Sequence, residues 1–83
     1  MHITAKVNKV CSSKVDFDLI DGKVYNVVFT GGCNGNLKGI CSLVKGQRAE
    51  TVVEKLQGIT CGSKPTSCPD QLARALTQAM SQQ

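Results

Sequence analysis

The apolar residues of this chain change their spacing near Gly31-Gly32, and this change constrains the fold more than any other feature of the sequence. Before it, apolar and polar residues alternate over 3–7 and over 15–19, as in strands with one buried face. The pair Asp21-Gly22, which suits a tight hairpin, then leads into a third strand-like stretch over 24–30. The first half therefore predicts a three-stranded antiparallel sheet.

The second half of the chain has the spacing of helices. Apolar residues recur at helical intervals over 37–44 after Asn36, a good N-cap, and Gly46 suits the end of that helix. A second short helix is predicted from about Arg48 to Leu56, and a third from Pro69, which suits the first position of a helix. Three helices on one face of the sheet would bury both apolar surfaces, so we expect an α+β fold of two layers.

Length and composition limit what this fold can be. With 83 residues the chain forms one domain at most, 1–83, and large catalytic folds are excluded. Aromatic residues make up only 4% of the chain, and a small core without them often needs a disulfide or a bound metal. The net charge of +4 is spread along the chain rather than clustered, so binding of nucleic acid is unlikely in comparison with the alternatives below.

The cellular compartment decides how the cysteines are interpreted. No apolar run approaches the roughly 18 residues that cross a bilayer, and the first residues lack the apolar stretch of a signal peptide. A cytoplasmic protein without a membrane partner is expected. Thiols stay reduced there, so the odd set of five cysteines predicts metal ligands, redox thiols or small buried side chains.

Four of the five cysteines lie at junctions between predicted elements. Cys11 falls with Ser12 and Ser13 between the first two strands, Cys33 between the sheet and the first helix, and Cys61 and Cys68 on either side of 62–67. The first and third strands of an antiparallel sheet run in the same direction, so Cys11 and Cys33 follow strands that end at the same edge. We therefore expect these thiols to converge at one end of the molecule.

The local surroundings add to this expectation for two of them. Glycines around Cys33 allow backbone amides to turn toward a thiolate or a cluster sulfur. Cys68 occupies the predicted N-cap of the last helix, where the positive end of the helix dipole favours a thiolate. Cys41 belongs to the apolar stripe over 37–44 and is expected to be a buried side chain. His2 and the pair Asp16 and Asp18 are expected on wet surfaces.

Two functions follow from these residues. The leading hypothesis is a four-thiolate site for zinc or an iron–sulfur cluster, with Cys11, Cys33, Cys61 and Cys68 as ligands; all-sulfur sets suit both. The alternative is a redox accessory in which Cys61 and Cys68 form a reversible disulfide. Neither the metal, the partner nor the oligomeric state is fixed by the sequence.

The run Thr66-Ser67-Cys68-Pro69-Asp70 carries the motif that names the TSCPD domain, and 31–40 resembles a second motif of the small stand-alone members of that family. The resemblance covers nearly the whole chain. In the family pattern Cys11, Cys33, Cys61 and Cys68 match its cysteine positions, whereas Cys41 falls where serine is usual.

Related TSCPD segments occur at the C-terminus of cobalamin-dependent ribonucleotide reductases. The resemblance thus implies an accessory role in ribonucleotide reduction, and so in DNA synthesis, with ribonucleotide reductase or an iron–sulfur acceptor protein as partner. Stand-alone members tend to inherit a ribonucleoside-diphosphate reductase label, but 83 residues are too few for the barrel of that enzyme. Whether the chain is an enzyme is left open.

A fainter similarity is to iron–sulfur scaffolds of the IscU and NifU type. In those proteins, too, three strands lead into a Gly-Cys turn, helices follow, and a cysteine begins the last helix. Cys11, Cys33 and Cys68 would match the three cluster cysteines in order. Ser67 stands where the scaffolds have a histidine, and an aspartate expected near Ser13 is absent; Cys61 would supply the missing ligand.

Overall fold

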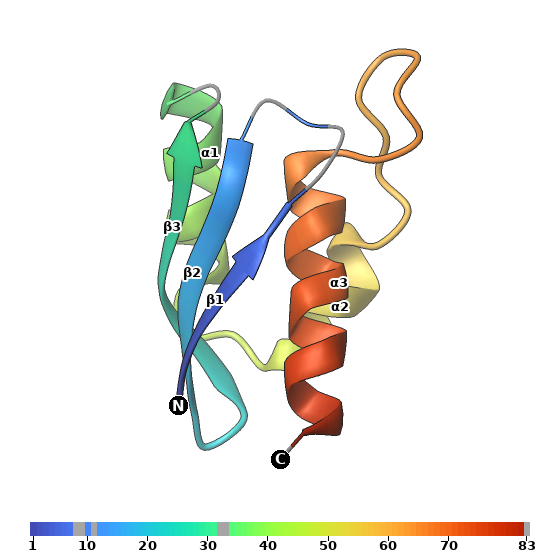
Figure 1. The fold of residues 1–83 in the computed structure, drawn as a ribbon. Helices are drawn as coiled ribbons and strands as arrows, with labels where there is room; N and C mark the ends of the chain where they lie inside the picture. The colour runs from blue at the N-terminus through green and yellow to red at the C-terminus, as the bar shows by residue number, and fades with distance from the viewer. Residues whose placement is uncertain (8–9, 11, 32–33, 83) are drawn as a thin grey trace.

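The computed structural model describes residues 1–7, 10, 12–31 and 34–82. Three antiparallel strands in the order β1-β2-β3 precede three helices, as Figure 1 shows. The strands are β1 (His2–Lys6), β2 (Ser12–Ile20) and β3 (Lys23–Gly31), and the helices are α1 (Asn34–Val44), α2 (Ala49–Leu56) and α3 (Cys68–Ser81). The predicted α+β arrangement is confirmed.

The turn between β2 and β3 and a bulge in β3 set the register of the sheet. Asp21 and Gly22 both have positive φ, 52° and 76°, as a tight hairpin turn of the predicted kind requires. Farther along, the register shifts between Asp16 and Asp18, opposite Asn26 with its φ of 55°. This bulge allows Val24 and Val27, three residues apart, both to be buried.

Several predicted boundaries were wrong by one to three residues, and three of them concern the same end of the molecule. Ser12 and Ser13 belong to β2 rather than to a connection, and both pair or bond with the end of β3. The first helix begins at Asn34, before the predicted cap at Asn36. The last helix begins at Cys68 rather than Pro69, because the residue before it supplies the cap. The second helix agrees with its prediction, with Arg48 as its N-cap.

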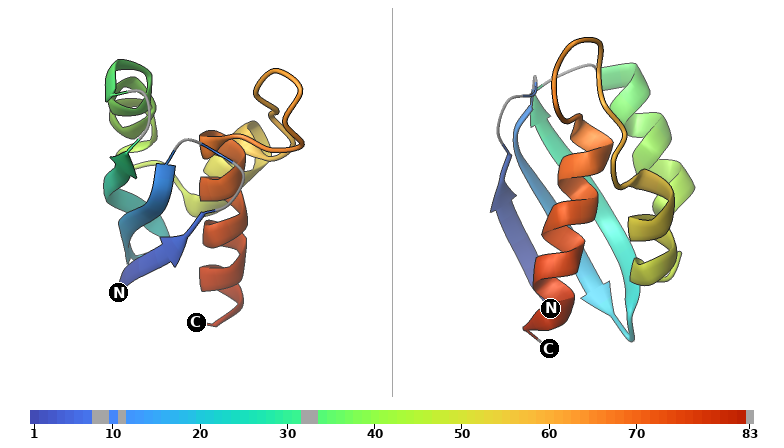
Figure 2. Two further views of the ribbon diagram at one scale, coloured as in Figure 1. Left: turned by 45° about the horizontal axis from the view of Figure 1, so that its top comes forward. Right: turned by 90° about the vertical axis from the view of Figure 1, so that its right-hand side faces the viewer.

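The core lies between one face of the sheet and the helices. Its largest fully buried side chains are Phe17, Leu72, Leu76, Val15 and Val24. They come from β2, β3 and α3, so these elements share one apolar interior, against which α1 and α2 place Val44 and Val52. Figure 2 shows α2 and α3 lying over the sheet and α1 alongside β3. Within the part of the chain that is described, no helix has the length and apolar content needed to cross a membrane.

The opposite face of the sheet carries a network of polar side chains. His2 Nδ1 lies 2.7 Å from Asp18 Oδ1, and the Asn26 amide donates to the other Asp18 oxygen at 2.8 Å. The Thr4 hydroxyl donates to Asp16. The hydrogen bond to Asp18 raises the pKa of His2, and bonds from Thr4 and Asn26 lower the pKa values of Asp16 and Asp18. The face that was expected to be solvent-exposed thus carries polar side chains that are hydrogen-bonded to one another.

The direction of the elements brings five of their ends together. β1 ends, β2 begins, β3 ends, and α1 and α3 begin at the end of the molecule that is uppermost in Figure 1. The segment 57–67, which joins α2 to α3, also reaches this end. The chain segments that carry the predicted thiols therefore approach one another.

Candidate functional site

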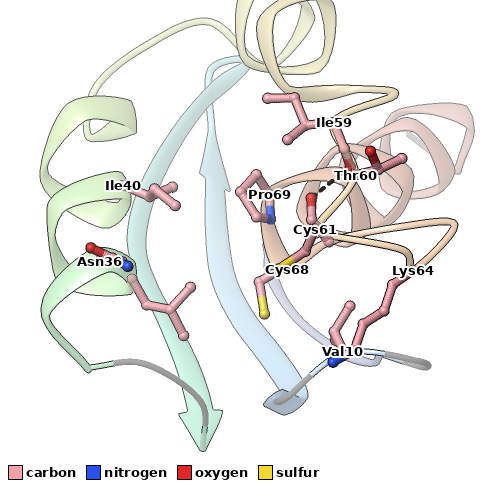
Figure 3. A pocket seen from close by; sticks show the side chains of 11 residues that line it. Val10, Asn36, Ile40, Ile59, Thr60, Cys61, Lys64, Cys68 and Pro69 are labelled. Carbon is pink, nitrogen blue, oxygen red and sulfur yellow. Dashed lines mark hydrogen bonds between the residues drawn. The ribbon is translucent and has the colours of Figure 1, made fainter.

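A pocket of about 260 Å³ opens at this end, between α1 and the first turn of α3. Most of its wall is apolar, and Figure 3 shows Ile40 on one side facing Pro69 and Cys68 on the other. Its lining residues are Val10, Asn36, Leu37, Ile40, Ile59, Thr60, Cys61, Lys64, Ser67, Cys68 and Pro69. Lys64 provides the cationic group among them.

Two of the four predicted ligands line this pocket. Cys68 is buried, with 6% of its surface exposed, and Cys61 is exposed. Neither these two nor Cys41 forms a disulfide with another of the described cysteines. Cys11 and Cys33 lie outside the described residues, so their predicted place at the site stays a prediction.

Described residues close in sequence to Cys11 and Cys33 lie at or next to the same pocket. The Ser12 hydroxyl oxygen is 3.2 Å from Cys68 Sγ, and it donates to the carbonyl of Gly31 over 3.4 Å. Ser12 is buried, with only 3% of its surface exposed. Val10 and Asn36 belong to the wall. Ser12 thus links Cys68 to the end of β3, while Val10 and Asn36 line the pocket that Cys68 faces.

Ser67, and not Cys68, caps the last helix. The Ser67 side chain accepts a hydrogen bond from the Asp70 amide at 3.2 Å, and Cys68 is already helical. The prediction that Cys68 is the N-cap was wrong because a serine oxygen is the stronger acceptor for the free amides of a first turn. Cys68 still stands at the start of α3, and Figure 3 shows its sulfur directed into the pocket.

Ser67 also fastens the segment 57–67 to the helix. Its hydroxyl donates to the Ile59 carbonyl at 2.7 Å, and near the tip the Cys61 amide donates to the Thr66 carbonyl at 3.2 Å. The Lys64 amide closes a turn on the Cys61 carbonyl at 3.0 Å. Cys61 is therefore held in a short hairpin rather than in a free loop.

Asp70 is the buried anchor of this arrangement, with 4% of its side chain exposed. Its carboxylate accepts from the Gly58 amide at 2.7 Å, from the Thr66 hydroxyl and from Arg74 Nε at 3.0 Å. Burial on its own raises the pKa of Asp70, but the bonds from Thr66 and Gly58 and the charge of Arg74 outweigh it and leave the pKa below its usual value. The carboxylate is therefore charged and structural.

Among the described residues, no group of three or more His, Cys, Asp and Glu side chains is arranged to hold a metal ion. The two cysteines at the pocket nevertheless provide soft sulfur atoms, the donor type of zinc and iron–sulfur sites. Cys41 packs against the core but is only partly buried, less than predicted, and this burial raises the pKa of its thiol. It is therefore a poor ligand.

The roles of two residues at this end, Asp70 and Ser12, were not predicted. Asp70 had a signal, because a serine followed three residues later by an acidic residue is typical of a capped helix start. Ser12 had none, since nothing in the sequence relates it to Cys68, 56 positions away.

Fold and pocket together define a small α+β domain with two cysteines, Cys61 and Cys68, in a pocket between α1 and the start of α3. A family model described as the TSCPD domain matches residues 1–80, so the chain belongs to the TSCPD domain family, as its two motifs predict. Comparison with the curated proteins and with the solved structures gave no match.

Proposed function

We propose that this domain binds zinc or an iron–sulfur cluster through Cys11, Cys33, Cys61 and Cys68. One observation carries the proposal: the Ser12 hydroxyl lies within 3.2 Å of Cys68 Sγ and within 3.4 Å of the Gly31 carbonyl. Ser12 follows Cys11 directly, and Gly31 stands two residues before Cys33. Three of the four thiol-bearing segments thus meet at one hydroxyl group, and Cys61 lines the same pocket.

The chemistry of the group agrees with this location. Four thiolates provide the tetrahedral, all-sulfur set that suits zinc or iron. Structural zinc contributes on the order of 10 kcal/mol to the folding of small domains, which would compensate for a core with few aromatic residues. A cytoplasmic location, where thiols stay reduced, suits such ligands. The resemblance to IscU and NifU scaffolds supports the cluster form, and that to reductase segments supports ribonucleotide reductase as the partner.

Metal analysis of protein purified without oxygen tests the proposal. We expect nearly one zinc ion or one cluster per chain, with visible absorption only for the cluster. Cys11→Ser, Cys33→Ser, Cys61→Ser and Cys68→Ser should each lower the metal content, whereas Cys41→Ser, the matched control, should keep it. Wild-type protein that is fully folded and free of metal would contradict the proposal.

A second function is favoured by the unequal exposure of two cysteines at one pocket. Cys61 is exposed and Cys68 is buried, as in a redox pair with one attacking and one resolving thiol. Their oxidation to one disulfide would release two electrons and two protons, which reduce a disulfide of a partner such as ribonucleotide reductase to two thiols. In that case Cys11→Ser and Cys33→Ser would leave the reaction intact, so the same four variants distinguish the two functions.

A further inference from the structure

The outer edge of β1 has backbone groups without a partner among the described residues. Met1 and Leu19 exchange two backbone bonds, of 2.9 and 2.8 Å, and the Val7 amide donates to the Ser13 carbonyl at 3.2 Å. Because hydrogen-bonded pairs alternate in an antiparallel ladder, Ile3 and Ala5 also bond to β2. The amides and carbonyls of the even-numbered residues His2, Thr4 and Lys6 therefore point away from the sheet.

A groove runs along this outer edge. It has a volume of about 460 Å³ and is lined by all five residues of β1 and by Ala75, Gln78, Ala79 and Gln82 of α3. Figure 2 shows β1 as the outermost strand of the sheet. Five residues of strand extend roughly 17 Å, so a peptide of similar length would fit beside β1, between the strand and the helix.

The other edge of the sheet is less open. The Val24 amide donates to the Gln47 carbonyl at 2.9 Å, and the Val24 carbonyl accepts from the Gly46 amide at 2.7 Å. The Ala49 amide closes on the Gly22 carbonyl at 2.9 Å. The segment before α2 therefore occupies part of the β3 edge, and an added strand is directed to β1.

Charge indicates what kind of strand fits. Lys6 and Lys14 stand directly opposite each other on the open face, and both are exposed. Two like charges in a cross-strand pair are unfavourable, so an acidic side chain next to Lys6 would relieve them. Asp16 and Asp18, on the same face, are already bonded to Thr4, Asn26 and His2.

A second copy of the chain fits this edge less well. Antiparallel pairing of two β1 strands about Thr4 would place Lys6 of one copy beside His2 of the other, in a row with Lys14. Asp18, which stands opposite His2, already bonds to His2 and Asn26, so the two lysines would meet only a carboxylate whose oxygens are engaged at each end of the pairing. On the helix side, by contrast, Ala75 and Ala79 leave room for apolar side chains of an added strand next to half-buried Ile3 and Ala5.

We propose that the β1 edge binds an extended peptide segment of a partner protein as a fourth, antiparallel strand. The first, third and fifth peptide residues pair with Lys6, Thr4 and His2, and the first is acidic. The second and fourth are small and apolar and face α3. Backbone bonds would supply the affinity, and the alternating side chains the specificity. This site uses none of the cysteines, so it is independent of the proposed metal function.

The test uses the full chain and a peptide of sequence Glu-Val-Thr-Val-Thr, blocked at both ends. In a titration followed by amide NMR, the peptide should shift the His2, Thr4 and Lys6 signals saturably. Methylation of the central Thr nitrogen, which faces β1, should weaken binding about tenfold, equivalent to about one hydrogen bond. Methylation of a Val nitrogen, which faces away, is the matched control and should change it little. Replacement of Glu by Lys should weaken binding as well.

Variants of the protein give a second measurement. Thr4→Pro removes the outward amide and the hydroxyl bond to Asp16 but leaves the backbone bonds to β2, and should abolish peptide binding; proline is tolerated at such edge positions. Thr4→Ala, which loses the same hydroxyl but keeps the amide, should bind like the wild type. Absence of saturable shifts, equal effects of the two methylated peptides, or a dimer of the free chain formed through β1 would each overturn the proposal. The peptide comparison remains decisive if Thr4→Pro does not fold.

Discussion

Replacing Asp70 with alanine should destabilise the domain more than any other exchange of a single polar side chain near the pocket. The carboxylate holds three donors from three places: the Gly58 amide, the Thr66 hydroxyl and Arg74. Thr66 is buried, with 2% of its surface exposed, whereas Gly58 is exposed. Removal of the carboxylate therefore costs a different amount of stabilising free energy for each of the three donors.

The size of the effect follows from these exposures. The buried Thr66 hydroxyl, left without its charged acceptor, accounts for about 1.5–2 kcal/mol, and the Gly58 amide, which water can reach, for about 1 kcal/mol. Arg74 has 64% of its side chain exposed and contributes less than about 0.5 kcal/mol. Asp70→Ala should thus lower the free energy of unfolding by about 3 kcal/mol, a fall in Tm of about 12–24 °C for a domain of this size.

Urea unfolding followed by circular dichroism measures this loss, with two variants for comparison. Asp70→Asn keeps the shape and an acceptor oxygen but not the charge, and should lose about half as much, since charge-assisted bonds are about twice as strong as neutral ones. Arg74→Ala should lose less than about 0.5 kcal/mol. The reasoning is refuted if Asp70→Ala is no more destabilising than Arg74→Ala.

The pH dependence gives an independent check on the same carboxylate. The pKa of Asp70 in the folded protein lies below its ordinary value of 3.8, so the unfolded chain binds the proton first as the pH falls. The stabilisation is therefore complete above the unfolded pKa and is lost as the pH falls through the folded pKa. The difference in stability between wild type and Asp70→Asn should shrink below about pH 4 and be constant near neutrality.

Three further predictions concern other parts of the fold. Asp18→Asn should lower the pKa of His2 toward its ordinary value of 6.5 in an NMR titration, and an unchanged pKa would contradict the role of Asp18. Because the folded pKa of His2 is raised, the stabilisation by His2 is present below the unfolded pKa and fades as the pH rises through the folded pKa. Asn26→Val should cost about 1–2 kcal/mol in urea unfolding, because a β-branched residue resists the left-handed conformation, whereas Asn26→Gly should cost less; equal losses would argue against backbone strain. Ser67→Ala should cost about 1–2 kcal/mol through loss of the helix cap, while Ser81→Ala, on the exposed last turn, should change the free energy of unfolding little.

The sequence predicted those features that depend on regular repetition. The alternation over 15–19 placed Val15, Phe17 and Leu19 on the buried face, and Asp21-Gly22 marked the hairpin. The bulge at Asn26 was not predicted: asparagine tolerates a positive φ better than most residues, but the apolar run around it has the pattern of a regular strand. At the bulge, the side-chain amide of Asn26 donates a hydrogen bond to Asp18 on the neighbouring strand, a contact that the sequence pattern does not reveal.

The candidate site was predicted only in outline. Strand direction predicted that β1 and β3 end on the same side of the sheet, which the structure shows, and Cys61 and Cys68 line a pocket at that end; the place of Cys11 and Cys33 stays a prediction. The roles of Ser12 and Asp70 depend on contacts made in the folded state, to Cys68 and to Gly58. Such contacts join residues whose separation in sequence carries no periodic pattern, so spacing alone does not reveal them.

Most side chains of the motif at 66–70 hold the chain in place, whereas Cys68 presents its sulfur to the pocket. Thr66, Ser67 and Asp70 direct their polar groups to the backbone and to one another, whereas the Cys68 sulfur is directed into the pocket that Ser67 and Pro69 also line. The reactive atom can therefore be exchanged while its attachment stays firm. A histidine or a carboxylate substituted at position 68, in evolution or in the laboratory, would be held by the same rigid backbone and would give the pocket a different chemistry.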